Sequence, residues 1–294
     1  MMNLFAAYHP LIDLLLLNCG CAFGQYIVLR AGAFSIANAG LTSLGAYTAG
    51  ILATQYGAGL GTTLLCSTLI GLVVAILLSL PLARLRGVYQ AIATLAFVQI
   101  VLTLALYAEG LTGGALGLNA IPKLVGTPTL LIFVVVVFYV MAALDRTRLG
   151  QAFDAIRQDE IVAATLGVRV VSTQMVAFAL SGLISGLFGG LIALHTYSID
   201  PNQFGFPMLV SLLAMVVLGG RRSIYGPIVG ATILTLLPEI ARPLSDNRTL
   251  IHGMLLILII VFLPKGVVDS LRGLSLRKPR ARQQQRVAGD VPST

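Results

Sequence analysis

The sequence predicts an all-α integral membrane protein, a polytopic bundle of roughly eight to ten transmembrane helices. Hydrophobic residues make up 57% of the 294 residues and charged residues only 10%, whereas soluble domains average about 25% charged residues. Several uncharged runs approach the roughly 20 residues that a helix needs to cross a bilayer. Because lipid offers no water to bond backbone groups, such runs fold as helices. The alternation expected of barrel strands is absent.

The expected membrane spans follow one another with short breaks. The loop at 109–127 is rich in glycine and holds no span. Run 208–219 is short, so it fits either a short span or a re-entrant segment. Run 170–194 carries Gly and Ser at intervals of four residues, a pattern that lets helix backbones approach closely. The nine apolar runs cover residues 11–29, 33–56, 62–83, 88–107, 130–144, 170–194, 208–219, 226–237 and 250–263.

The second run, 33–56, is unusually rich in small and polar residues. Ser35, Asn38, Thr42, Gly45 and Ala49 recur at helical spacing, so they predict one stripe along a helix. Such a stripe serves either close helix packing or the lining of a polar path. The fourth run adds further polar groups. If solute crosses along this chain, the candidate path residues are Ser35, Asn38, Thr42, Ser43, Gln90 and Thr94.

Residues 146–169 form the one long polar interruption between two membrane-length runs. Phe153, Ile156, Ala163 and Leu166 have spacings that fit one helical face, while the charged residues project elsewhere. An amphipathic helix of this kind lies at an interface or docks on a soluble partner. The alternative is a solvated helix that merely joins two spans.

The arginines predict the orientation of the chain. Segments around Arg84 and Arg86, at 146–169, around Arg221 and at 265–286 hold most of the positive charge. Cytoplasmic loops carry the excess of Lys and Arg, so we expect these segments in the cytoplasm. With nine crossings, the N-terminus then lies outside and the C-terminus inside.

Two regions are expected along the chain. Residues 1–274 form the membrane domain, in which 146–169 is a cytoplasmic amphipathic segment. Residues 275–294 form a basic cytoplasmic tail that lacks apolar periodicity and is expected to be disordered.

Chemical motifs are missing from the chain. It has no phosphate-binding loop, no zinc-protease or nucleophile-elbow motif, and no Cys and His spacing typical of a metal site. We therefore expect no catalytic residue, no metal and no cofactor in this chain. The net charge of +8 sits largely in loops and in the tail, so nucleic acid is not an expected partner. Asp13, Glu109 and Glu239 fall near span ends, whereas ion-coupled carriers keep such groups in the bundle interior.

Several stretches together resemble one family. RLRGVYQAIATLAF at 84–97, LTGGALGL at 111–118 and SIANAGLTSLGAY at 35–47 resemble the permease subunits of branched-chain amino acid ABC importers. AIRQDEIVAATLG at 155–167 is similar to the cytoplasmic coupling segment of that family. The details are closer to the LivM-type subunit than to its LivH-type partner. The paired Arg221 and Arg222 depart from the small-residue turn that is frequent in the family.

The resemblance implies a transmembrane permease in the bacterial inner (plasma) membrane. Its expected partners are the lipid bilayer, a second LivH-like permease, two ATP-binding subunits that supply the ATP site, and a periplasmic solute-binding protein. The implied solutes are branched-chain or related amino acids, although family members also handle urea and aromatic acids. The residues that would couple the chain to the ATPase are Ala155, Ile156, Arg157, Glu160, Ala163, Ala164 and Gly167.

Two other functions stay open from the residues alone. A stand-alone secondary transporter of small polar solutes would need a coupling acid inside the membrane. A non-transporting membrane scaffold would need no solute path. Co-purification of an ATPase subunit separates the importer from both.

Overall fold

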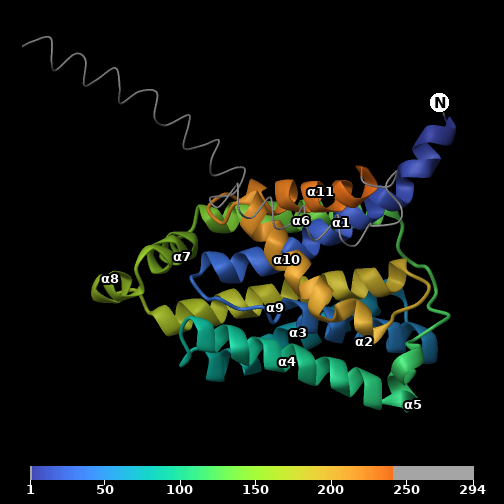
Figure 1. Ribbon diagram of the computed structural model, residues 1–294, viewed down its shortest axis with the longest axis horizontal. Helices are drawn as coiled ribbons and strands as arrows, with labels where there is room; N and C mark the ends of the chain where they lie inside the picture. Colours follow the sequence, from blue (N-terminus) through green and yellow to red (C-terminus); the bar gives the residue numbers. More distant parts are fainter. Residues whose placement is uncertain (1, 241–294) are drawn as a thin grey trace, which may run out of the picture.

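The computed structural model describes residues 2–240, which fold as a bundle of helices (Figure 1). The expected last span, 250–263, and the basic tail lie outside the described residues. Within the described range no β-strand forms, and one isolated bridge joins Leu118 and Ile199. The helices are α1 (Met2–Arg30), α2 (Asn38–Gln55), α3 (Leu60–Leu82), α4 (Val88–Tyr107), α5 (Glu109–Thr112), η1 (Gly114–Leu116), α6 (Thr127–Asp145), α7 (Arg148–Gln158), α8 (Glu160–Thr165), α9 (Val170–His195), η2 (Pro201–Phe204), α10 (Phe206–Gly219) and α11 (Tyr225–Ile240).

Each of the eight apolar runs predicted between residues 2 and 240 coincides with a helix. Six helical stretches are long and apolar enough to cross a membrane: α1 from His9, α3, α4, α6, α9, and η2 together with α10. The apolar part of α11 is shorter. Helix α2 lies beside these helices but is less apolar, because Gly, Ser, Thr and Asn occupy much of it. These findings confirm the predicted all-α polytopic bundle.

Helix α2 starts later than predicted. Its first residue is Asn38, and the preceding residues 33–37 are not helical. The chain leaves α1 through Gly32, whose φ of +78° is a conformation that glycine adopts without strain. The prediction that Ser35 shares a helical stripe with Asn38 and Thr42 is therefore wrong.

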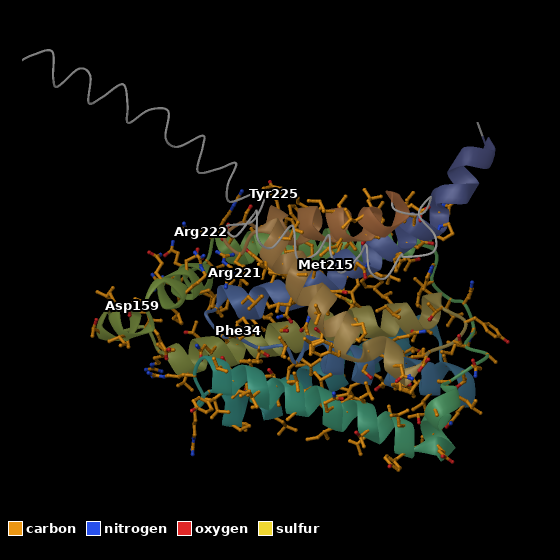
Figure 2. The ribbon with its side chains drawn as sticks, in the orientation of Figure 1. Phe34, Asp159, Met215, Arg221, Arg222 and Tyr225 are labelled. Atoms are coloured by element: carbon orange, nitrogen blue, oxygen red, sulfur yellow. The ribbon has the colours of Figure 1, made fainter. Side chains whose placement is uncertain are left out.

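The two ends of the bundle differ in charge. Helices α7 and α8 project from one end, and α5 lies at the other (Figure 1). Every arginine of residues 2–240 lies in the loops or helix ends on the α7 and α8 side. Figure 2 shows Asp159 at the tip of this side, with Arg221 and Arg222 toward it. On the opposite side the described loops carry Lys123.

Helix α9 is the central element, and it packs against α1, α2 and α3. The approach is so close that glycines face the backbone of the neighbouring helix. A Cβ atom on Gly45 would overlap the backbone of Gly186, and one on Gly71 would overlap the carbonyl of Gly182. This arrangement confirms the predicted small-residue packing of run 170–194.

A polar contact joins the same three helices. The Asn38 side chain donates to the carbonyl of Cys21 on α1 at 3.1 Å. Its Oδ1 accepts a hydrogen bond from the Ser181 hydroxyl at 2.6 Å and lies 2.7 Å from the hydroxyl of Ser185. Both serines belong to α9, so one buried amide connects α1, α2 and α9.

Replacing Gly186 with Val should destabilise the fold. The added side chain would overlap the backbones of Ser67 and Gly71, which move only with a whole helix. We expect a loss of at least about 1–3 kcal/mol, typical of overpacking, seen as a lower unfolding temperature in detergent. Gly61→Val is the control, because a Cβ there meets no atom within 4 Å. Equal stability of the two variants would contradict the packing argument.

Replacing Asn38 with Leu should lower the amount of folded protein. The change removes three interhelical contacts and leaves the Ser181 and Ser185 hydroxyls without that partner. Interhelical hydrogen bonds in membranes are each worth about 0.6–1.7 kcal/mol. Asn119→Leu is the control, since that exposed amide bonds only the Leu116 carbonyl. Normal accumulation of Asn38→Leu with lost solute uptake would instead favour a path at Asn38.

Candidate functional site

The polar segment 146–169 forms two short helices instead of the single predicted helix. The break is at Asp159, whose backbone is extended (φ −158°, ψ +114°). Its carboxylate accepts hydrogen bonds from the backbone N–H groups of Ile161 at 2.9 Å and Val162 at 3.0 Å. Asp is among the favoured N-cap residues, so Asp159 ends α7 and starts α8. Gly167, with a φ of +87°, terminates α8.

The break decides which apolar residues face the protein. Phe153, Ile156 and Ala163 are buried, as the spacing predicts. Leu166 is 77% exposed, so its predicted place on that face is wrong. The prediction assumed one continuous helix, and the turn at Asp159 gives α8 a different rotation.

Helix α8 presents apolar side chains on a part of the molecule that stands away from the long helices (Figure 1). Ile161 is 71% exposed, and Val162 and Leu166 are also exposed. Ile161 and Val162 lie on α8 and Leu166 caps its end, and together they make an apolar surface, which we call the α8 surface. Exposed apolar patches of this kind mark contact sites for partners.

The predicted coupling residues divide into three groups. Ile156 and Ala163 are buried within this chain. Ala155, Arg157 and Glu160 are half-buried, and Ala164 and Gly167 are exposed. A partner could reach the second and third groups, while the first supports the segment from within. Sequence reasoning missed Ile161 and Val162, because it sought the apolar face that packs inward.

A pocket of ≈ 440 Å³ lies beside the α8 surface, between the end of α3 and the start of α9. An ion pair of 3.2 Å joins Arg86 and Glu160 at its wall. Such exposed pairs contribute at most about 1 kcal/mol. The pocket is lined by Ala83, Arg86, Glu160, Ile161, Ala164, Arg169, Val170, Val171 and Ser172.

A buried arginine forms ion pairs that connect α7 to the bundle. Arg30, the last residue of α1, is only 2% exposed. Its guanidinium donates to Asp154 of α7 at 2.9 and 3.3 Å and to Asp145 at the end of α6. Arg157 lies 3.5 Å from the same Asp154 carboxylate. The four residues, Arg30, Asp145, Asp154 and Arg157, are called the Arg30 cluster below.

The cluster balances two positive charges against two negative ones where three helices meet. A buried charge requires such partners, because desolvation penalises an unpaired ion. The spacing predicted that the charged residues of segment 146–169 project away from its apolar face, and it gave no partner for Arg30. The available signal was that Arg30, Asp145 and Asp154 all fall at one predicted membrane face.

All six predicted path residues are buried. Two of them bond the backbone of the non-helical residues 33–37. The side-chain oxygen of Gln90 accepts from the Phe34 backbone N–H at 3.0 Å, and the Thr94 hydroxyl accepts from that of Ile36 at 3.1 Å. Gln25 donates to the Ser35 carbonyl at 2.7 Å. Gln90 and Thr94 thus satisfy backbone groups that a helix would otherwise have paired.

Ser43 differs from the other five candidates. Its hydroxyl is buried and has no hydrogen-bond partner within the described part of the chain, and the same holds for the hydroxyl of Tyr47. The two residues are one turn apart on α2. They are the buried side-chain groups of α2 that are left free to bond water or solute among the described residues.

At the end of the bundle opposite α7, a histidine meets an acid. His195 Nε2 lies 3.5 Å from the Asp13 carboxylate, and His195 Nδ1 lies 3.3 Å from the Val125 carbonyl. Asp13 is buried in α1, and His195 is the last residue of α9. Both residues lie near the ends of their spans, and for Asp13 this place was predicted.

Comparison with known proteins places this architecture in a family. The family described as "Branched-chain amino acid transport system / permease component" matches residues 19–264. The high-affinity branched-chain amino acid transport system permease protein LivM of Salmonella typhimurium is 30% identical over 88% of this chain and 69% of the relative. LivM of Escherichia coli K12 shows the same identity and coverage.

A more distant relative carries another name. The autoinducer 2 import system permease protein LsrC of Yersinia pestis is 28% identical, over 82% of this chain and 72% of its own length. No solved structure matches this chain. The match to the family covers most of the chain and includes the bundle, α7 and α8. The chain therefore belongs to the permease-component family of branched-chain amino acid transport systems.

Proposed function

We propose that this chain imports branched-chain or related amino acids across the inner membrane as one of two permeases in an ABC importer. Two separate ATP-binding subunits would supply the energy, and a periplasmic solute-binding protein would deliver the solute. The observation that carries the proposal is the exposed α8 surface at the arginine-rich end of a membrane bundle. Exposed apolar side chains on a projecting polar segment favour a binding partner in the water phase.

The arginines support a cytoplasmic position for α7 and α8. Loops that hold Lys and Arg stay in the cytoplasm during insertion, and all arginines of residues 2–240 lie at this end. An ATPase works where ATP is present, so its docking surface belongs on the same side. The N-terminus is then periplasmic, because α1 runs from the opposite end toward Arg30.

The ATPase would contact α8 directly and reach the adjacent pocket. Ile161, Val162 and Leu166 supply the apolar contact, and Ala164 allows close approach. Arg86 and Glu160 at the pocket wall add charges that orient a partner. The proposed role of Ile156 and Ala163 is to support this surface, since both are buried.

The solute is proposed from the relatives and from the chemistry of α2. The LivM relatives are named for branched-chain amino acids, and LsrC is named for autoinducer 2. The LivM matches are higher in identity and cover more of this chain, which favours an amino acid. The unpartnered hydroxyls of Ser43 and Tyr47 offer dipoles to a zwitterion without holding it by full charge.

Reconstitution tests the function. We expect the purified chain to retain an ATPase subunit and a second permease, and the complex in proteoliposomes to accumulate radiolabelled leucine with ATP and its binding protein. Imposed proton or sodium gradients should drive no uptake without ATP. Gradient-driven uptake by the chain alone would instead support a secondary transporter. An absence of ATPase in the purified material would contradict the importer.

Charges placed on the α8 surface should release the ATPase. The double variant Ile161→Asp and Leu166→Asp removes two exposed apolar side chains and replaces no buried residue. The chain should therefore fold and insert normally. We expect roughly tenfold less co-purified ATPase, since charged groups are disfavoured at interface cores. Leu116→Asp is the matched control, because Leu116 is 87% exposed at the opposite end. Full retention of the ATPase by the double variant would place docking elsewhere.

A further inference from the structure

The Arg30 cluster connects parts of the chain that are far apart in sequence. Arg30 is separated from Asp145 by 115 positions and from Asp154 by 124. Helices α6 and α9 are linked to the 146–169 segment by the chain itself, whereas α1 and α2 are not. Movement of α7 can therefore reach α1 only through side-chain and packing contacts. Arg30 supplies the ion pairs among these contacts.

The junction after Arg30 also lies directly on α7. A Cβ atom on Gly32 would lie 3.2 Å from the Ile156 side chain and 3.4 Å from the Cα atom of Arg157. The backbone turns here with positive φ and continues into the non-helical residues 33–37. The ion pairs of Arg30 and the packing at Gly32 thus both hold α7 against the junction that follows α1.

The non-helical residues 33–37 connect this junction to α4 and α2. Gln90 and Thr94 of α4 bond the backbone of Phe34 and Ile36, and α2 begins directly afterwards at Asn38. The contacts run without a gap from α8 through α7 and the Arg30 junction to α2 and α4. Ser43 and Tyr47, with their unpartnered hydroxyls, lie on that same α2.

We propose that Arg30 is a positioning residue that transmits movement of the docked α7–α8 segment to the α1–α2 junction, and so to the solute path. The inference rests on the proposed importer function and adds the route by which ATPase movement enters this chain. Arg30 suits this role because its planar guanidinium holds two carboxylates on different helices at fixed angles. A flexible or apolar contact would let α7 move without α1.

The test separates coupling from assembly. Wild type, Arg30→Gln, Arg30→Lys and Asp154→Asn are each purified as the full complex and reconstituted, and leucine uptake per ATP hydrolysed is measured beside the amount of bound ATPase. Because α8 is untouched, Arg30→Gln should retain its ATPase and hydrolyse ATP, while uptake per ATP falls roughly tenfold, within the range typical of coupling between sites. Arg30→Lys keeps the charge and should recover part of the loss. Asp154→Asn removes one partner and should show a similar defect.

Two comparisons sharpen the result. Arg84→Gln is the matched control, because Arg84 is an exposed arginine at the same end with no ion pair within residues 2–240; it should couple as wild type does. Arg30→Gln combined with Asp154→Asn should be no worse than the poorer single variant, as expected for residues that act through one contact.

A second measurement does not depend on the solute. Spin labels at Gln158 on α7 and at Tyr56 beyond the end of α2, both exposed, should change separation between the resting and ATP-trapped wild-type complex. That change in separation should be lost in Asp154→Asn. This variant tests the inference even if Arg30→Gln fails to fold. Normal uptake per ATP in the variants, or a loss of complex with a normal ratio in what remains, would overturn the inference. If the wild-type chain purifies without an ATPase subunit, that result would overturn the proposed function and this inference with it.

Discussion

The bilayer interior has no water, so each polar group within it must find a partner in the protein. This constraint explains most of the polar side chains in the bundle. The non-helical residues 33–37 lack part of the helical hydrogen bonding, and Gln25, Gln90 and Thr94 bond backbone groups there instead. Without these side chains the non-helical backbone would be too costly at this depth. The break before α2 therefore depends on polar residues of α1 and α4.

The same constraint sets how the helices attract one another. Lipid is as apolar as leucine, so helices associate through close packing and hydrogen bonds. Helix α9 uses both, since its glycines meet the backbones of α2 and α3 while Ser181 and Ser185 meet Asn38. The central position of α9 follows from this pair of features, and the outer surfaces of α3, α4 and α6 stay apolar for lipid or a partner.

The sequence was sufficient to predict the helices, because long apolar runs in lipid have one stable form. The start at Val88 and end at Tyr107 of α4 match the prediction. Local breaks in the helices were harder to predict. Asp159 and Ser35 lie at such breaks, and the contacts that stabilise the breaks cannot be read from residue spacing. In the site, Ala164 and Gly167 are exposed, Ile161 was missed, and the Arg30 cluster was not predicted. Its members are distant in sequence, and only the packing of α1, α6 and α7 brings them together.

The Arg30 cluster combines two demands that are usually in conflict. A contact that transmits movement must be stiff, and removing one partner from a buried ion pair costs about 3–5 kcal/mol in soluble proteins. A contact that operates in a cycle must also tolerate rearrangement. Asp145 and Asp154 are partly exposed, while Arg30 is buried. Water can therefore solvate the acids, whereas the buried guanidinium of Arg30 depends on them as its charge partners. In the proposed coupling, the buried guanidinium follows Asp154 when α7 moves, because a buried charge left without its partner is costly, and the end of α1 moves with it.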